Sequence, residues 1–190
     1  MPRLFAGLEI PAHVASVLSG LRGGLPGARW AEPSDYHITL RFIGDIGNRM
    51  AADIDDLLAD IRRAPLDIRI AGLDVFGGDR PHALLATVEP NRQLTELQSE
   101  VERLIRACGM EIERRRFQPH VTLARLRSAS SLDVADYLSV RGYFPPQTFR
   151  AERFVLFSAR DSVGGGPYRV ETAYALRQSA MTGRFEYASR

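Results

Sequence analysis

The sequence contains no lysine: all 25 of its lysine-plus-arginine positions are arginine. They are balanced by 23 acidic residues, so the formal net charge at pH 7 is only +2. Guanidinium groups suit phosphate recognition because their planar fork of donors matches phosphate oxygens. The chain is nevertheless nearly neutral and has no large positive field, so composition alone is only a weak indication of nucleic-acid binding.

The chain is also poor in cysteine and in long apolar runs. Cys108 is the single cysteine, which excludes an internal disulfide and a metal site built on two thiolates. No run approaches the roughly eighteen consecutive apolar residues of a membrane span. Residues 1–5 lack the basic and apolar regions that begin a secretory signal. We therefore expect a cytoplasmic protein that does not contact a membrane.

Hydrophobic residues make up 45% of the 190 positions, enough for a substantial core. No Pro/Gly/Ser-rich linker is long enough to separate independent domains. We expect a single α+β domain over residues 1–178 and a loose tail over 179–190. Alternating and helical apolar spacings predict strands at 4–10, 36–43, 66–76, 83–88, 120–126, 149–159 and 168–176, and helices at 11–23, 54–61, 91–108 and 132–140. The strands at 66–76 and 83–88 are expected to pair as a hairpin.

Histidine is scarce, yet two of the four histidines occur in the same short motif. The two copies are His37-Ile38-Thr39-Leu40 and His120-Val121-Thr122-Leu123. Threonine occupies 7 of 190 positions, so chance would place it two residues after two of four histidines only about one time in a hundred. The repeat therefore indicates a shared role. His13 and His82 have no such partner, and we interpret them as surface or structural residues.

Strand geometry explains the spacing of two within each motif. Side chains alternate between the faces of a strand, so the histidine and threonine of one copy share a face while the apolar residues point to the other. Two such strands along one cleft would present two imidazoles and two hydroxyls. Imidazole gives or takes a proton near neutral pH, and hydroxyls can donate to phosphoryl oxygens. The motifs therefore predict acid–base chemistry on a small anion without a metal.

These motifs and their flanks resemble the His-x-Thr-x signatures of the two-histidine (2H) phosphoesterase superfamily, and in particular its RNA 2',3'-cyclic phosphodiesterase (LigT-like) branch. The flanks that carry the resemblance are the strand closed by proline at 3–11, Trp30 and Pro33 before the first motif, and Phe117-Gln118-Pro119 before the second. The resemblance covers the chain from Leu4 to about Leu176. It implies a bilobal, pseudo-symmetric fold in which two antiparallel sheets with outer helices surround a central cleft.

The resemblance also implies an activity, namely hydrolysis of RNA 2',3'-cyclic phosphate ends to 2'-phosphomonoesters without a cofactor. In that reaction His37 is the proton donor to the leaving 3'-oxygen, and His120 is the proton acceptor from the attacking water. Thr39 and Thr122 hold the phosphoryl oxygens. The expected substrates are RNA with a cyclic phosphate terminus or small cyclic nucleotides, and no obligate protein partner is expected.

Four further residues are candidates for substrate binding. Phe42 and Arg125 lie five residues after the motif histidines and resemble family positions that hold the nucleotide and its phosphate. Strict alternation instead directs Arg41 toward the cleft, unless a bulge re-aims the chain. The resemblance places Tyr168, which follows the glycines at 164–166, at the rim of the cleft.

Several alternatives remain open from the sequence. Arg114-Arg115-Arg116 could line an RNA path or form a solvated turn. The same fold could bind nucleotides without turnover, or could cleave or join 2',5'-linked RNA. A metallohydrolase is disfavoured because neither motif histidine has a His-x-His or His-Glu-x-x-His companion.

Overall fold

The computed structural model describes residues 3–159 and 166–177. Its strands are β1 (Arg3–Glu9), β2 (Ala28–Trp30), β3 (His37–Asp45), β4 (Leu66–Phe76), β5 (Ala83–Val88), β6 (His120–Leu126), β7 (Gln147–Ala151), β8 (Arg153–Ala159) and β9 (Tyr168–Ala175). Its α-helices are α1 (Ala12–Ser19), α2 (Asn48–Ala59), α3 (Arg92–Ala107) and α4 (Ser131–Arg141), and a short 3-10 helix covers Pro33–Asp35. The tail expected over 179–190 and the glycines at 164 and 165 lie outside the described residues.

The strands form two antiparallel halves that meet at a single point. The order across the sheet is β7-β4-β5-β6-β3-β1-β8-β9, with β2 beside β6. Ile38 and Val121 are the one register pair between β3 and β6, whereas the neighbouring strands within each half pair over several residues. The predicted α+β class and bilobal arrangement are therefore confirmed, with the two sheets joined at one bridge.

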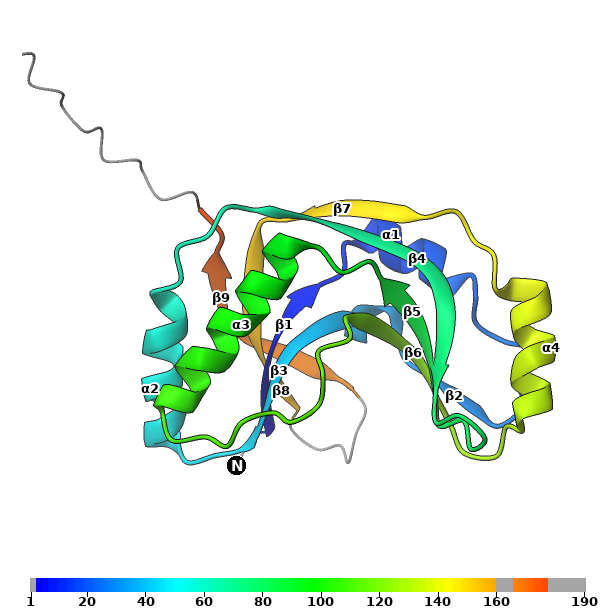
Figure 1. Cartoon of the computed structure of the whole chain (residues 1–190), viewed down its shortest axis with the longest axis horizontal. Coiled ribbons are helices and arrows are strands. Elements are labelled where there is room, and N and C mark those ends of the chain that lie inside the picture. Colours follow the sequence, from blue (N-terminus) through cyan, green and yellow to red (C-terminus); the bar gives the residue numbers. More distant parts are fainter. Residues whose placement is uncertain (1–2, 160–165, 178–190) are drawn as a thin grey trace, which may run out of the picture.

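The helices cover the outside of the two halves, and Figure 1 shows α2 and α3 beside one half and α4 at the far side of the other. Helix α3 packs on β3 and α2, while α1 packs on β7. Helix α3 is capped at its N-terminus, because the Asn91 side chain accepts a hydrogen bond from the backbone of Leu94 at 2.8 Å. The apolar face of α3 is fully buried and consists of Leu94, Leu97, Val101 and Ile105.

One hydrophobic core runs through both halves, and the bridge between them lies inside it. Ile38 and Val121 are completely buried, as are Leu8 on β1 and Leu84 on β5. The apolar positions of the two motifs therefore anchor β3 and β6 in the core, as the alternation predicts. Among the described residues, no helix is long and apolar enough to cross a membrane.

Two sequence expectations about the strands were wrong. The run at 149–159 is two strands, because the chain passes from one half-sheet to the other at Glu152: β7 pairs with β4, whereas β8 pairs with β1 in the half that contains β3. The apolar pattern shows no break there because β8 is buried over Phe154–Ala159 on both of its faces. Strand β2 and the 3-10 helix at Pro33–Asp35 were not expected, since three-residue elements are too short to show a period.

Candidate active site

The meeting point of the two halves brings the two motifs together. Because Ile38 lies opposite Val121 and both point into the core, the neighbouring histidines and threonines emerge on the other face of the sheet. His37, Thr39, His120 and Thr122 are each half-buried. All four line one cleft of about 710 Å³, which is within the size range of small-molecule sites.

A bulge follows the threonine in each motif strand. In β3, Thr39 pairs with Gly7 and Arg41 with Ala6, so Leu40 is an extra residue. The equivalent residue of β6 is Leu123, which is extra against β5. The two strands consequently have the same burial pattern over their first seven residues. Each extra residue reverses the faces of the residues that follow it. The bulges therefore favour the positions that the family resemblance indicates over those that strict alternation predicts.

The residue five positions after each histidine therefore faces the cleft. Phe42 and Arg125 are exposed on the sheet and line the same cavity as the histidines. Arg125 comes from the second half of the molecule, and Phe42 comes from the first. The structure thus brings both of these predicted binding residues to the motif histidines.

Arg41 is placed differently from the expectation based on alternation. Its side chain is only 8% exposed and forms an ion pair with Glu102 of α3. Its two terminal nitrogens donate to the backbone carbonyls of Phe42 and Glu111. Arg41 borders the cleft, but its guanidinium is already occupied and is not a free ligand for phosphate.

The two imidazoles are held in the same way. His37 Nδ1 lies 2.7 Å from the carbonyl oxygen of Asp35, and His120 Nδ1 lies 2.7 Å from the carbonyl oxygen of Gln118. A carbonyl oxygen only accepts, so each Nδ1 carries a hydrogen. This tautomer leaves Nε2 of each ring to take or give a proton.

The surroundings of the two imidazoles differ. Three aromatic rings surround His37: Phe5, Tyr168 and Phe157 lie with centroids 4.7, 5.0 and 5.5 Å away. This burial lowers the pKa of His37 below its ordinary value of 6.5, and the Asp35 carbonyl opposes the shift. Within the described part of the chain, His120 has one aromatic neighbour, Phe76, at 5.0 Å.

Tyr168 reaches the site from β9. It lines the cleft, and its backbone nitrogen donates to the Asp35 carboxylate at 3.0 Å. Burial raises the pKa of the Tyr168 hydroxyl, while the positive charge of Arg125 opposes this. Tyr168 of the first half and Arg125 of the second both line the cleft.

Several cleft residues were not predicted from the sequence, among them Asp35 and Arg29. Asp35 holds both His37 and Tyr168, but it is part of no recognisable motif. Arg29 lines the cleft from the short strand β2, which no periodicity revealed. Of the arginine triplet, Arg115 and Arg116 line the cleft and Arg114 does not.

The other candidate features lie elsewhere. His13 and His82 are both exposed and are absent from the residues that line this cleft in the described part of the chain. Within residues 3–159 and 166–177, no three histidine, cysteine, aspartate or glutamate side chains gather where they could hold a metal ion.

A family comparison places this arrangement among known proteins. The model of the 2'-5' RNA ligase superfamily matches residues 10–162. The chain belongs to the 2'-5' RNA ligase superfamily. Membership in this superfamily confirms the resemblance to two-histidine phosphoesterases that the paired motifs indicate.

Curated members of the superfamily match over different lengths. The RNA 2',3'-cyclic phosphodiesterase of Aeropyrum pernix is 39% identical over 111 residues, which are 57% of this chain and 62% of that protein. The enzyme of that name from Bacillus subtilis is 32% identical over 65% of this chain and 71% of its own. The Archaeoglobus fulgidus protein of the same name is 27% identical, covering 95% and 92%.

Solved structures of the superfamily fold share the architecture. Escherichia coli LigT complexed with 3'-AMP superposes with a TM-score of 0.75 at 22% identity, covering 94% of this chain and all of that one. The protein TT0787 of Thermus thermophilus gives a TM-score of 0.76 at 22% identity with the same coverage. At this identity the likeness shows the fold.

Proposed function

We propose that this protein hydrolyses RNA 2',3'-cyclic phosphate ends to 2'-phosphomonoesters, by acid–base catalysis between His37 and His120. The observation that carries the proposal is the pair of equivalent imidazoles on one cleft, each with Nδ1 bonded to a backbone carbonyl and Nε2 left free. The name shared by the curated relatives supports it.

The proposed reaction uses one proton transfer at each end of the displacement. His120 Nε2 takes a proton from water, whose oxygen forms a bond to phosphorus. The bond from phosphorus to the 3'-oxygen breaks, and His37 Nε2 donates its proton to that oxygen. The phosphate remains on the 2'-oxygen, and solvent restores the starting protonation of both rings.

The remaining residues act on the charge and on the nucleotide. The hydroxyls of Thr39 and Thr122, on the same strand faces as the histidines, donate to the non-bridging oxygens. Arg125 adds a positive charge from the second half of the molecule. Phe42 and Tyr168 provide aromatic surface for the nucleoside beside His37, on the side where the 3'-oxygen leaves.

The environment of His37 suits a proton donor that works on a bound anion. Enclosure by aromatic rings lowers the pKa of His37, which makes its imidazolium the stronger acid once it forms. A bound phosphodiester carries a negative charge and favours that imidazolium. We therefore expect His37 to gain its proton with the substrate, and the pH–rate profile to be bell-shaped.

We also propose the setting of this reaction. The substrate is RNA with a terminal cyclic phosphate or a small cyclic nucleotide, and the compartment is the cytoplasm, where one unpaired cysteine, Cys108, stays reduced. No metal ion or other cofactor takes part in the proposed steps, because the two histidines supply both proton transfers.

The test is hydrolysis of a nucleoside 2',3'-cyclic phosphate in excess EDTA, with the 2'- and 3'-monophosphate products resolved. We expect wild-type turnover to the 2'-phosphate, and kcat lower by about a thousandfold or more in His37→Ala and in His120→Ala. His13→Ala, which removes an exposed histidine on α1, is the matched control and should retain full activity.

Each alternative function has its own outcome. Nucleotide binding without turnover by the wild type would show a binding module. Loss of activity in EDTA, restored by a divalent metal, would overturn the two-histidine mechanism. Turnover of 2',5'-linked RNA with no hydrolysis of the cyclic phosphate would assign the cleft to the ligase chemistry after which the superfamily is named.

A further inference from the structure

Two arginines stand directly opposite each other beside the catalytic cleft. Arg29 of β2 and Arg125 of β6 are register partners in an antiparallel pair, so their side chains leave the same face within about 5 Å of each other at Cβ. Both side chains are exposed and both line the cleft. Like charges in this position destabilise a sheet, and an anion bound between them would offset the repulsion.

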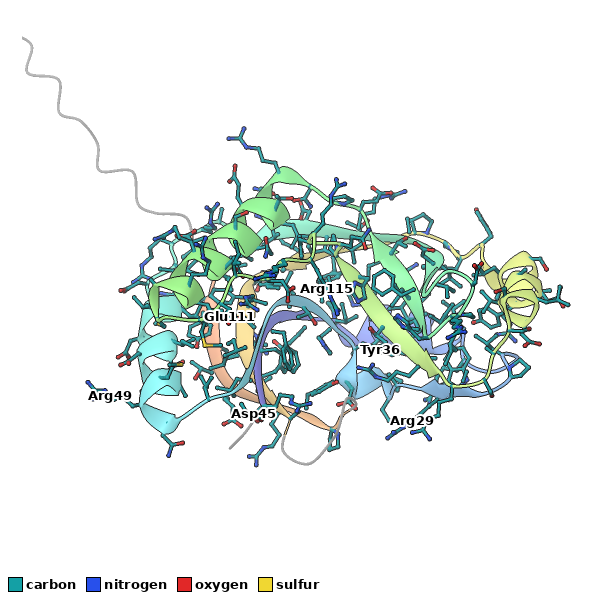
Figure 2. All side chains as sticks on the ribbon, turned by 60° about the horizontal axis from the view of Figure 1, so that its bottom comes forward. Arg29, Tyr36, Asp45, Arg49, Glu111 and Arg115 are labelled. Carbon is teal, nitrogen blue, oxygen red and sulfur yellow. The ribbon has the colours of Figure 1, made fainter. Side chains whose placement is uncertain are left out.

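More positive charge reaches the cleft from the connection between α3 and β6. Arg115 and Arg116 line the cavity, and Figure 2 shows Arg115 on this connection and Arg29 on β2, at separate parts of the structure. Within residues 3–159 and 166–177, no carboxylate forms an ion pair with Arg29, Arg115 or Arg116. Arginines that do form such pairs include Arg22, Arg41, Arg63, Arg69, Arg92, Arg150 and Arg153.

Positively charged side chains outnumber negatively charged ones around the cleft. Among the described residues, six arginines and three carboxylates line it, although the whole chain has a formal net charge of only +2. The carboxylates are already engaged: Glu32 pairs with Arg22, Glu113 lies 3.8 Å from Arg41, and Asp35 accepts from the backbone of Tyr168. The cleft is therefore a basic groove on a nearly neutral protein.

Arg41 fixes the connection that carries Arg115 and Arg116. Its buried guanidinium pairs with Glu102 and donates to the carbonyl of Glu111. The Glu102 carboxylate also accepts from the backbone nitrogen of Glu113 at 3.1 Å. The arginine-bearing segment is thus fastened to β3 and α3, which holds it at the cleft.

An aromatic residue follows two of these arginines in the sequence. Trp30 comes after Arg29 and Phe117 after Arg116. Both residues border the same cleft, and their half-buried rings also pack against the hydrophobic core. Arginines that track a phosphate backbone, interleaved with rings on which bases stack, are typical of sites for single-stranded nucleic acid. One terminal cyclic phosphate, a single negative charge, does not account for this surface, since the motif residues and Arg125 already surround it.

We propose that Arg29, Arg115 and Arg116 form a second binding region, which holds the phosphodiester backbone of the RNA next to its terminal nucleotide. Trp30 and Phe117 are the stacking surfaces of this region. The inference rests on the proposed function of the His37–His120 cleft. This second binding region makes the protein selective for single-stranded RNA ends over free cyclic nucleotides.

The experiment compares two substrates that share the same reacting group. One is a nucleoside 2',3'-cyclic phosphate, and the other is a single-stranded oligonucleotide of several residues that ends in the same cyclic nucleotide. We expect the wild type to have a higher kcat/KM for the oligonucleotide. The ratio of the two kcat/KM values should fall at least tenfold in Arg29→Ala and in the double variant Arg115→Ala/Arg116→Ala.

Matched controls are available in the chain. Arg114→Ala removes the neighbouring arginine that does not line the cleft, and Arg127→Ala removes an exposed arginine just after β6. Neither should change the ratio. Arg29→Gln, which keeps most of the side-chain bulk, should behave like Arg29→Ala, and thermal unfolding of each variant shows that it is folded.

Binding gives a readout that does not depend on turnover. For the oligonucleotide that ends in a 2'-phosphate, the slope of log affinity against log salt should fall by about 0.7 for each phosphate that a variant no longer binds. An unchanged ratio and an unchanged slope in the cleft variants would overturn the inference, as would an equal fall in Arg114→Ala. Failure of the proposed function is separate: the wild type would then leave the nucleoside cyclic phosphate intact, whatever its salt slope.

Discussion

His37 and Asp35 are joined by a hydrogen bond of 2.7 Å between the imidazole Nδ1 and the Asp35 carbonyl oxygen. The carboxylate of the same aspartate accepts from the backbone of Tyr168 at 3.0 Å. A residue at the end of the short helix Pro33–Asp35 therefore orients the imidazole with its main chain and holds the start of β9 with its side chain.

Asp35 variants separate these two effects. Asp35→Ala removes the bond to Tyr168, so we expect KM for the cyclic nucleotide to rise severalfold, whereas Asp35→Asn can still accept this bond and should retain the wild-type KM. Both variants remove the negative charge that raises the pKa of His37, so both should lower that pKa in an NMR titration. A KM that rises equally in both variants would contradict this role.

The half-buried imidazole of His37, enclosed by aromatic rings, makes stability depend on pH. Its pKa is lowered from the ordinary value of 6.5, so the unfolded chain binds this proton at higher pH than the folded protein does. Above about pH 6.5 the His37 imidazole is neutral in both states, and its contribution to the free energy of unfolding is fully present. As the pH falls toward the lower pKa of the folded state, the unfolded chain takes up the proton first, and this contribution is lost. Urea unfolding of the wild type and of His37→Gln between about pH 5 and pH 8 measures it. The wild type should lose more stability on acidification, and parallel curves would contradict the sign.

The Arg41–Glu102 pair should be important for stability. Both side chains are largely buried, at 8% and 15% exposed, so Arg41→Ala leaves an uncompensated charge and should cost about 3 kcal/mol in urea unfolding. Arg41→Met/Glu102→Gln removes both charges and should recover much of the loss. Arg150→Ala breaks an exposed pair with Asp67 and should cost less than about 1 kcal/mol.

Gly7 allows β1 to approach β3 beside the first motif. A Cβ at this position would lie 2.8 Å from the backbone oxygen of Ile38, and a backbone atom cannot yield as a flexible side chain does. Gly7→Ala should therefore cost about 2 kcal/mol and lower kcat, because the shift moves His37. Gly47→Ala, where an added Cβ meets nothing within 4 Å, is the control in the same assays. Equal unfolding midpoints for the two variants would argue against close packing here.

The opposed arginines should lower the stability of the free protein. Replacing Arg29 removes a like charge directly across from Arg125, so Arg29→Ala should raise the free energy of unfolding by a few tenths of a kcal/mol. The gain should shrink as salt screens the repulsion. Thermal unfolding at low and high ionic strength measures both effects, and destabilisation at low salt would show that the repulsion is not significant.

Local sequence pattern determined the chemistry-bearing residues of this protein. The spacing of two in each motif places His37 with Thr39, and His120 with Thr122, because alternation is a property of a single strand. Local pattern also predicted the hairpin of β4 with β5. These features depend only on neighbouring residues, so they can be read without knowing which strands pair.

Tertiary structure alone decided the features that arise from pairing between distant strands. The bulges at Leu40 and Leu123 exist only against β1 and β5, and they turn Phe42 and Arg125 to the cleft while Arg41 turns to α3. The opposition of Arg29 and Arg125 likewise depends on the register of β2 against β6. Periodicity shows which side of a strand is buried, but register is set by packing across the whole core, and so the surroundings of the two histidines became visible only in the folded chain.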